Sequence, residues 1–292
     1  MIINISQLDD KQLKDLEDLR IRCKKENGST PNLYTHILAQ PRALPACLLY
    51  YKDNTLMGFL SAFFFYQNAV EIALLVDPAI RRQGLATELL KTILPLLQQH
   101  GFLKLIFSSP HLLNNSWLPA SNCSFLHSEY FMMRDDLSPV IDGKQSLHFR
   151  TATHDDIPVL YSLDEACFHK KPDEAIGRFN NLIDNREYHL IVALQNNHPI
   201  GKAHIRWEPQ GASLSDIAII PALQGKGLGT ALIAYCINYA LSEGRPNVSL
   251  DVETHNQRAL HLYTQLGFTI KNACDYWTIN IDQLKLKTSS KA

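Results

Sequence analysis

The sequence has little of what marks a metal, redox or membrane protein. Its six cysteines are scattered along 292 residues without a CxxC pair, which disfavours a zinc site and a disulfide framework. No apolar run is long enough to cross a bilayer, and the opening MIINISQLDD lacks the basic end and apolar core of a signal peptide. These absences predict a cytoplasmic protein with no bound metal and no membrane partner.

The sequence also has no excess of positive or negative charge. The 28 Lys and Arg residues nearly balance the 29 Asp and Glu residues, which leaves a net charge of −1. Because phosphate backbones are bound by clustered Lys and Arg, this balance argues against nucleic acid as a partner. Hydrophobic residues make up 46% of the chain, so one or two domains can each bury a core.

Two stretches of the chain resemble each other. VDPAIRRQGLATEL begins at Val76 and IIPALQGKGLGTAL at Ile219, and each places glycine between a strand pattern and a helix pattern. Upstream of each stretch, two apolar strand patterns are joined by a polar turn with Asn, which is typical of a hairpin. We therefore predict two copies of one unit, at 1–138 and 147–292, joined by a linker that includes DLSPVIDGKQS.

Each glycine corner precedes a helix pattern that finishes at a further glycine. The first of these helices contains Pro95, so we expect a bend or an early end there. The second copy continues with the helix pattern HNQRALHLYTQLGF and two strands, whereas the matching helix of the first copy is shortened or lost before two strands around 124–127 and 130–133. The hairpins predict an α/β (α+β) fold, in which each copy is a mixed, mostly antiparallel sheet flanked by helices.

The glycine corner is typical of an anion-binding site. Backbone N–H groups in the first turn of a helix have no partner within it, and the helix dipole favours negative charge there. The nucleotide pattern GxxxxGK[ST] is absent, and the dinucleotide pattern GxGxxG does not follow the strand directly. A tight turn that happens to be rich in glycine is the alternative explanation.

The corner QGKGLG fits the acetyl-CoA signature [QR]-x-x-G-x-[GA] through Gln224, Gly227 and Gly229. The segment LDVETHNQRALHLYTQLGF resembles the later motif of the same family. The chain thus resembles the GNAT superfamily of N-acetyltransferases over nearly its whole length. Only the second copy has the complete motif, so the resemblance implies that it is catalytic and that the first copy is degenerate. This tandem arrangement is similar to that of mycothiol synthase, a likeness that identifies no substrate.

The resemblance implies that acetyl-CoA is the cofactor. Loop amides would hold its pyrophosphate, and its pantetheine arm would pair with the backbone of the strand before the loop. The implied residues are Ile217, Ala218, Ile219, Gln224, Gly225, Lys226, Gly227, Leu228, Gly229, Thr230 and Asn256. The possible second cofactor site in the first copy comprises Leu74, Leu75, Val76, Arg81, Arg82, Gln83, Gly84, Leu85, Ala86 and Thr87.

By the same resemblance, Tyr263 is the catalytic general acid that protonates the departing thiolate. The residues alone also allow Tyr263 to be a core aromatic, and they allow Asn256 to be only a helix cap. No general base is assigned. Ser213 occupies the strand position where many family members have a glutamate, and a water chain is an equal alternative. Further candidates are Asp216, Glu253, Glu208, His204 and His255.

The predicted function is transfer of an acetyl group from acetyl-CoA to a primary amine of a small molecule by direct attack. Two alternatives stay open: a non-catalytic protein that binds or senses acyl-CoA, and an enzyme that acetylates proteins or peptides. We expect a monomer, because the first copy could supply the second lobe of the acceptor cleft.

Overall fold

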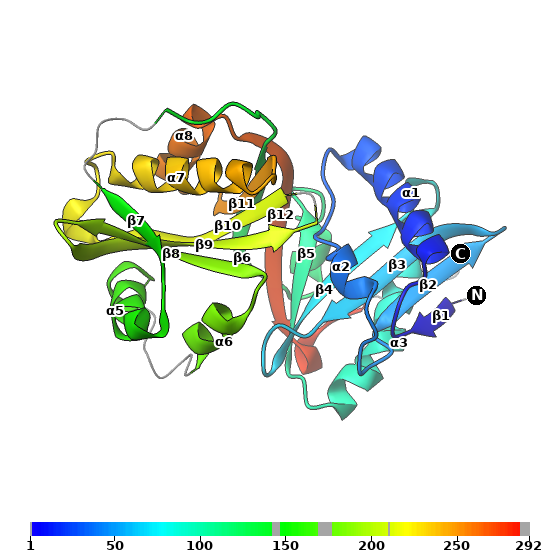
Figure 1. The fold of residues 1–292 in the computed structure, drawn as a ribbon. Coiled ribbons are helices and arrows are strands. Elements are labelled where there is room, and N and C mark those ends of the chain that lie inside the picture. The colour runs from blue at the N-terminus through cyan, green and yellow to red at the C-terminus, as the bar shows by residue number, and fades with distance from the viewer. Residues whose placement is uncertain (1, 142–146, 169–176, 210, 287–292) are drawn as a thin grey trace. The chain divides into compact units, whose positions relative to one another are not determined.

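The computed structural model describes residues 2–141, 147–168, 177–209 and 211–286 (Figure 1). The chain divides into two compact units. Unit 1 comprises Met1–Tyr130 with Asn272–Ala292, and unit 2 comprises Phe131–Lys271. The division into copies at 1–138 and 147–292 stays a prediction about the repeat, and residues 142–146 of its linker lie outside the described residues. The boundaries of the compact units differ from those of the predicted copies, because the C-terminal strand β12 pairs with a strand of unit 1.

Unit 1 is a mixed sheet with the strand order β1-β2-β3-β4-β5-β12. Strands β1 to β4 are successively antiparallel, β4 and β5 are parallel, and β12 is antiparallel to β5. Strand β6 begins in unit 1 and ends in unit 2. The elements are β1 (Ile2–Ile5), α1 (Asp10–Asn27), α2 (Thr35–Leu38), β2 (Cys47–Lys52), β3 (Thr55–Phe63), β4 (Ala69–Val76), α3 (Leu85–Gln99), β5 (Lys104–Pro110), α4 (Trp117–Ala120), β6 (Ser124–Arg134) and β12 (Thr269–Asn280).

Unit 2 repeats this arrangement with the strand order β11-β10-β9-β8-β7. Strands β7 to β10 are successively antiparallel and β10 is parallel to β11, so the expected mixed, mostly antiparallel sheet flanked by helices is confirmed. The elements are β7 (His148–Thr151), α5 (Ile157–Phe168), α6 (Arg178–Asp184), β8 (Tyr188–Gln195), β9 (His198–Glu208), β10 (Gly211–Ile219), α7 (Leu228–Ser242), β11 (Asn247–Glu253) and α8 (Gln257–Gln265).

Helices cover both faces of each sheet because the apolar residues of the strands alternate. In unit 1, Leu48 packs in a core with Leu89 of α3, whereas its neighbour Leu49 packs in a second core with Leu16 of α1. In unit 2, Leu160 of α5 and Phe179 of α6 share a core with β8. No helix in the described part of the chain is both long and apolar enough to span a bilayer.

Three local expectations can be compared with the structure. The expected early end at Pro95 is wrong, because α3 continues to Gln99 and Leu97 is fully buried in the core beyond the proline. The two strands expected around 124–127 and 130–133 are one strand, β6. The shortened helix of the first copy is confirmed as the four-residue α4, where the second copy has the nine-residue α8.

A first prediction concerns Asp156, which forms a capping box with Thr153 in the short 3-10 helix (His154–Asp156) just before α5. Its carboxylate accepts two hydrogen bonds from Arg150, both 2.7 Å, and one of 2.8 Å from the Thr153 backbone. Chiefly through Arg150, these bonds lower the pKa of Asp156 to about 2. Asp156→Asn should therefore lower the free energy of unfolding at pH 7 by about 1 kcal/mol.

The pH dependence has a definite sign. A carboxylate with a lowered pKa stabilises the fold above its unfolded value and loses that contribution as the pH falls through about 2. The deficit of D156N relative to wild type should thus shrink between pH 4 and pH 2 in urea unfolding curves. Asp155→Asn, which removes an exposed carboxylate next to it, is the control. Equal deficits in the two variants would contradict the assignment.

Candidate active site

The glycine corner of unit 2 presents unused backbone donors. Gly225 and Gly227 have φ values of 81° and 79°, a conformation that favours glycine. Helix α7 begins at Leu228 without a side-chain cap. Within the described residues, the N–H groups of Gly225, Gly227, Leu228, Gly229 and Thr230 donate to no acceptor. Together with the positive end of the helix dipole, these donors form a site for an anion such as a phosphate.

Gly229 is a glycine for a different reason. It lies inside α7, and its φ is not in the left-handed region. A Cβ built on it would meet its nearest protein atoms, in Leu262 and Ile219, at the ordinary contact distances of 3.9 Å and 4.0 Å. The protein itself therefore has room for a methyl group here, and the missing side chain keeps the space above the helix open.

That space is a cleft of about 350 Å³ in unit 2. It brings together most of the residues that the sequence assigned to coenzyme binding and catalysis. Those predicted residues are Ile217, Ile219, Gln224, Gly225, Gly227, Gly229, Thr230 and Tyr263. The cleft is not lined by four others, namely Ala218, Lys226, Leu228 and Asn256.

The strand before the corner leaves its parallel neighbour. β10 pairs with β11 only from Gly211 to Leu214, and a β-bulge follows between Ser215 and Ala218. The edge of β10 that faces β11 is therefore unpaired beyond Leu214, along the end of the strand that carries Ile219. This unpaired edge is where an amide-containing arm could add as a short strand.

The first residue of the signature ties the loop to the strand end. Gln224 Nε2 donates to the Ile219 carbonyl at 2.9 Å. In unit 1, Arg81 Nε donates to the Val76 carbonyl at 3.0 Å in the same way. The side chain at this position therefore shapes the corner in both units.

Tyr263 lies on α8 with its ring at the cleft. Its ring is edge-on to Phe268 at 5.9 Å, and the residue is only 9% exposed. Its hydroxyl makes no hydrogen bond with any described residue. Burial raises the pKa of Tyr263 to about 12, so the hydroxyl is protonated at neutral pH and can donate a proton.

Asn256 is confirmed as the cap of α8, since its side chain accepts from the Ala259 backbone at 3.1 Å. Sequence reasoning missed Arg258 and His261, which also line the cleft. An Arg258 guanidinium nitrogen lies 3.6 Å from a Cβ built on Gly225, so positive charge stands beside the free amides. The sequence could have indicated Arg258, because it follows the predicted cap Asn256 by two residues and so lies in the first turn of α8.

A protein-family model for the acetyltransferase (GNAT) family matches residues 13–115 and again residues 157–268. The chain belongs to this family. It is a GNAT N-acetyltransferase with two GNAT regions, and the second region contains the cleft.

The relatives agree with this assignment. A mycothiol acetyltransferase of Gordonia bronchialis is 26% identical over 215 residues, which cover 68% of this chain and 69% of the relative. An uncharacterized N-acetyltransferase of Methanocaldococcus jannaschii is 27% identical over 163 residues, which cover 51% of this chain and 72% of the relative.

Two solved structures share the fold along the whole chain. A GCN5-related N-acetyltransferase from Sphaerobacter thermophilus has a TM-score of 0.73 at 15% identity and covers 96% of both chains. A tandem GNAT protein from the clavulanic acid biosynthesis pathway has a TM-score of 0.63 at 15% identity, with coverage of 96% of this chain and 98% of that one. At these identities the likeness shows the tandem fold.

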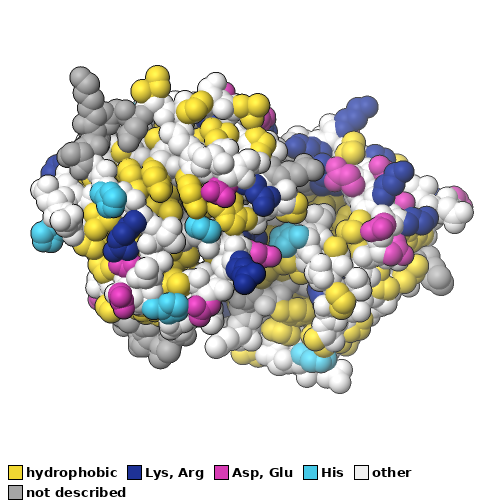
Figure 2. Space-filling view, viewed as in Figure 1, with side chains coloured by type: hydrophobic (Ala, Val, Ile, Leu, Met, Phe, Trp, Pro, Cys, Tyr) yellow, Lys and Arg dark blue, Asp and Glu magenta, His cyan; other side chains and the backbone are white. Residues whose placement is uncertain are grey.

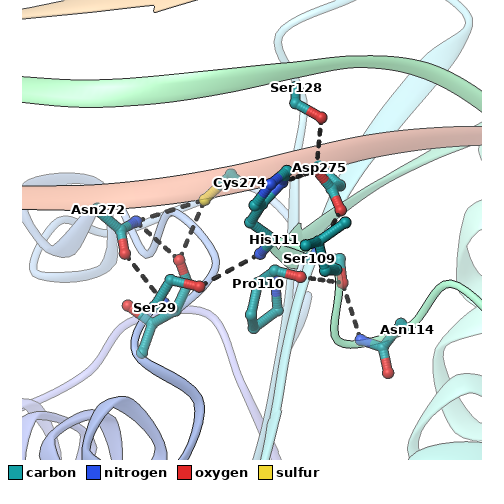
Figure 3. Close-up of polar contacts among 11 residues, drawn as sticks. Ser29, Ser109, Pro110, His111, Asn114, Ser128, Asn272, Cys274 and Asp275 are labelled. Carbon is teal, nitrogen blue, oxygen red and sulfur yellow. Dashed lines mark hydrogen bonds and ion pairs between the residues drawn. The ribbon is translucent and has the colours of Figure 1, made fainter. Parts of the chain in front are cut away.

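The first GNAT region has a strand opening of its own. In unit 1, β4 leaves β5 after Ala73, and the segment after α1 lies against the freed end of β5 and against β12 (Figure 3). Ser29 Oγ accepts from the His111 backbone at 3.2 Å, and Thr30 exchanges two hydrogen bonds with the Asn272 side chain. Protein atoms therefore line this strand opening. A second cofactor site at residues 74–76 and 81–87 stays a prediction.

The same opening contains a hydrogen-bonded aspartate. Figure 3 shows His111 and Ser128 directed at Asp275, whose carboxylate accepts from His111 Nδ1 at 2.6 Å and from Ser128 Oγ at 2.5 Å. The Leu112 backbone donates a third bond of 2.7 Å. Asp275 is thus fully satisfied by its own unit, as a structural carboxylate would be.

A second prediction tests the anion site. Gly229→Glu places a carboxylate among the amides, where it repels a phosphate, so acetyl-CoA affinity should fall by about 100-fold or more in isothermal titration calorimetry. The melting temperature should not fall, because an acid in the first turn suits the helix dipole.

Two controls complete this test. Gly229→Ala should fold and bind, since the methyl group meets no close neighbour. Ala86→Glu is the matched change in unit 1, and the binding stoichiometry of wild type and A86E reports whether that region also takes the coenzyme. Unchanged affinity in G229E would contradict the anion site.

Proposed function

We propose that unit 2 transfers the acetyl group of acetyl-CoA to a primary amine of a small molecule. One observation carries this proposal: the unused amides at the start of α7 and the protonated hydroxyl of Tyr263 belong to the same cleft. A coenzyme held by its diphosphate at the corner could lie along the unpaired edge of β10 with its other end toward that hydroxyl.

The residues fit acetyl-CoA, which supplies an acetyl group activated as a thioester. The amides of Gly225 and of residues 227–230 would hold the diphosphate, and Arg258 adds positive charge beside them. The backbone of residues 217–219 pairs with the pantetheine arm, while the Ile217 and Ile219 side chains provide an apolar wall. Asn256 fixes the start of α8 and so places Tyr263.

Tyr263 gives its hydroxyl proton to the sulfur when the thioester bond breaks. A hydroxyl with a pKa of about 12 is protonated throughout the physiological range, and a thiolate held next to it is a favourable proton acceptor once it is removed from water. A protein that only senses acyl-CoA has no need of such a donor in the cleft.

A small acceptor is favoured over a protein substrate by the surface and by the relatives. On the face in Figure 2, Lys and Arg side chains are interspersed with Asp and Glu and do not form a patch of one sign. The relative named mycothiol acetyltransferase matches 68% of this chain, whereas one named ribosomal protein bS18-alanine N-acetyltransferase matches 39%. A cytoplasmic, monomeric state is proposed with this function.

The test is an assay of thiol release from acetyl-CoA with a panel of amines. Glucosamine, cysteine, spermidine, kanamycin and an N-terminal alanine peptide represent the acceptor classes. We expect turnover with one of the small amines and none with the peptide. Turnover with the peptide alone would support the protein-acetylating alternative, and binding of acetyl-CoA without turnover of any amine would support the sensor.

A third prediction separates enzyme from sensor. Tyr263→Phe removes the proton donor and leaves the ring, so kcat should fall by about 100-fold while the Kd for acetyl-CoA changes by less than about twofold. Calorimetry and the thiol assay measure the two quantities on one preparation. Tyr235→Phe on α7, whose ring stacks on Phe149 away from the cleft lining, is the control. A fully active Y263F would remove Tyr263 from the mechanism.

A further inference from the structure

A group of charged side chains is buried in unit 2 between β9, β10 and the helices α5 and α6. Lys202 Nζ lies 2.5 Å from Asp164 Oδ1, and the Arg178 guanidinium lies 3.2 Å from Asp164 Oδ2 and 2.9 Å from Asp216 Oδ2. His204 Nδ1 lies 3.4 Å from the same Asp216 oxygen. These five residues are called the charged cluster below. Lys202 and His204 are 0% and 1% exposed.

The charged cluster has unused hydrogen-bonding capacity. In the described part of the chain, six buried side-chain N or O atoms lack a hydrogen-bond partner, and three of them are Asp164 Oδ1, Lys202 Nζ and His204 Nε2. The first two still face each other as an ion pair, whereas His204 Nε2 has no hydrogen-bond partner among the described residues. Buried polar atoms of this kind are uncommon and mark places where water or a ligand atom completes the bonding.

None of the five side chains of the charged cluster is in the lining of the coenzyme cleft, and the bulge of β10 connects the two. His204 is opposite Ser215, the last residue before the bulge, and Asp216 is the bulge residue with φ 46°. The next residue, Ile217, lines the cleft. Two adjacent residues of β10 thus belong one to the charged cluster and one to the cleft lining. Both lie beyond Leu214, where β10 no longer pairs with β11.

We propose that His204 is the proton acceptor for the amine substrate, acting at Nε2 directly or through one buried water. This inference rests on the proposed function. Asp216 can only accept a hydrogen bond when ionised, so the His204 nitrogen that faces it carries the proton and Nε2 keeps a lone pair. Asp216, which faces the ring, and Arg178, which pairs with Asp216, are positioning residues.

The proton balance is complete with the groups already named. One proton leaves the substrate ammonium for His204 Nε2 and then passes to solvent. The nitrogen of the neutral amine forms a bond to the acetyl carbon, and the thioester C–S bond breaks. The Tyr263 hydroxyl proton goes to sulfur, and the second proton shed by the nitrogen replaces it on Tyr263.

The surroundings keep His204 neutral. Burial is the largest influence and lowers the pKa of His204; Asp216 opposes this, and Lys202 and Arg178 lower the pKa further. From β8, the residue opposite His204 is the apolar Leu190, and from α5 the carboxylate of Asp164 is paired with Lys202. The base is therefore present at pH 7 and is lost as the pH falls through its lowered pKa.

The first arm of the test needs no activity. Long-range ¹H–¹⁵N spectra of the wild-type protein, assigned with His204→Gln, should show Nδ1 protonated and Nε2 unprotonated at pH 7, with titration below the ordinary histidine value. A His204 ring that is doubly protonated at pH 7, or that carries its single proton on Nε2, would overturn the inference.

The second arm is a pH profile with acetyl-CoA and the amine of the panel that turns over fastest. In H204Q, kcat should fall by about 100-fold or more and the acid limb of kcat/KM should disappear, while acetyl-CoA affinity is retained. The matched control is His189→Gln, since His189 accepts from Trp207 and is outside both cleft and cluster. An H204Q variant with wild-type rate and acid limb contradicts the role of His204.

The two failures are distinguishable. If the wild-type protein binds acetyl-CoA but turns over no amine, the proposed function falls, and the spectra still decide the tautomer and charge of His204. If the wild-type protein turns over an amine and H204Q does so equally well, the proposed function stands and the proton acceptor lies elsewhere.

Discussion

The parting of β10 from β11 is the constraint on which the site depends. Buried backbone groups are nearly always paired, and a parallel neighbour pairs β10 only as far as Leu214. Beyond that point the strand edge is unpaired, and the corner that follows points the first amides of α7 out of the helix. Both sets of groups gain partners if a polar chain with an anionic end lies along them, which is the form of an acyl coenzyme.

Both units keep part of this arrangement at the end of the fourth strand. Both retain a side chain that donates to the end of the fourth strand, Arg81 in unit 1 and Gln224 in unit 2. Both also place a cysteine against that carbonyl, Cys23 at 3.5 Å and Cys167 at 3.6 Å. The end of the fourth strand is therefore held by the same two kinds of contact in both units.

What differs between the units is the wall opposite the corner. In unit 2 this wall is the nine-residue α8, which carries Tyr263. In unit 1 the four-residue α4 stands in the matching place in the chain, and its Trp117 packs edge-on to Phe107 of β5 at 6.3 Å in the core. Trp117 packs against the core and has no hydroxyl that could donate a proton. The two units thus differ in this wall, while the corner is common to both.

The parts that the sequence predicted are those set by local bonding. The glycine corner, the Asn256 cap and the short helix α4 of the first copy depend on residues within one or two turns. The structure has all three. The early end at Pro95 failed because burial of Leu97 outweighs one missing helical hydrogen bond.

The parts that the sequence could not supply depend on distant residues. The bulge at Asp216 is held by Arg178 from another element, and the charged cluster joins α5, α6, β9 and β10. Simple alternation along the strand places Asp216 on the face away from Ser213. The extra residue of a bulge changes that alternation, and the sequence pattern of one strand does not reveal where a bulge lies.

In the proposed mechanism, one physical cause gives unit 2 both its acid and its base at neutral pH. Burial disfavours the charged form of any group, so it raises the pKa of Tyr263 to about 12 and lowers the pKa of His204 below its ordinary value. The tyrosine is then a neutral proton donor and the histidine a neutral proton acceptor over the same range of pH. Acyl transfer from a thioester to an ammonium needs both at once, because a proton must leave nitrogen before attack and another must reach sulfur as it departs. Neither group is charged in its working form, so the positive charge beside the corner is left to the coenzyme.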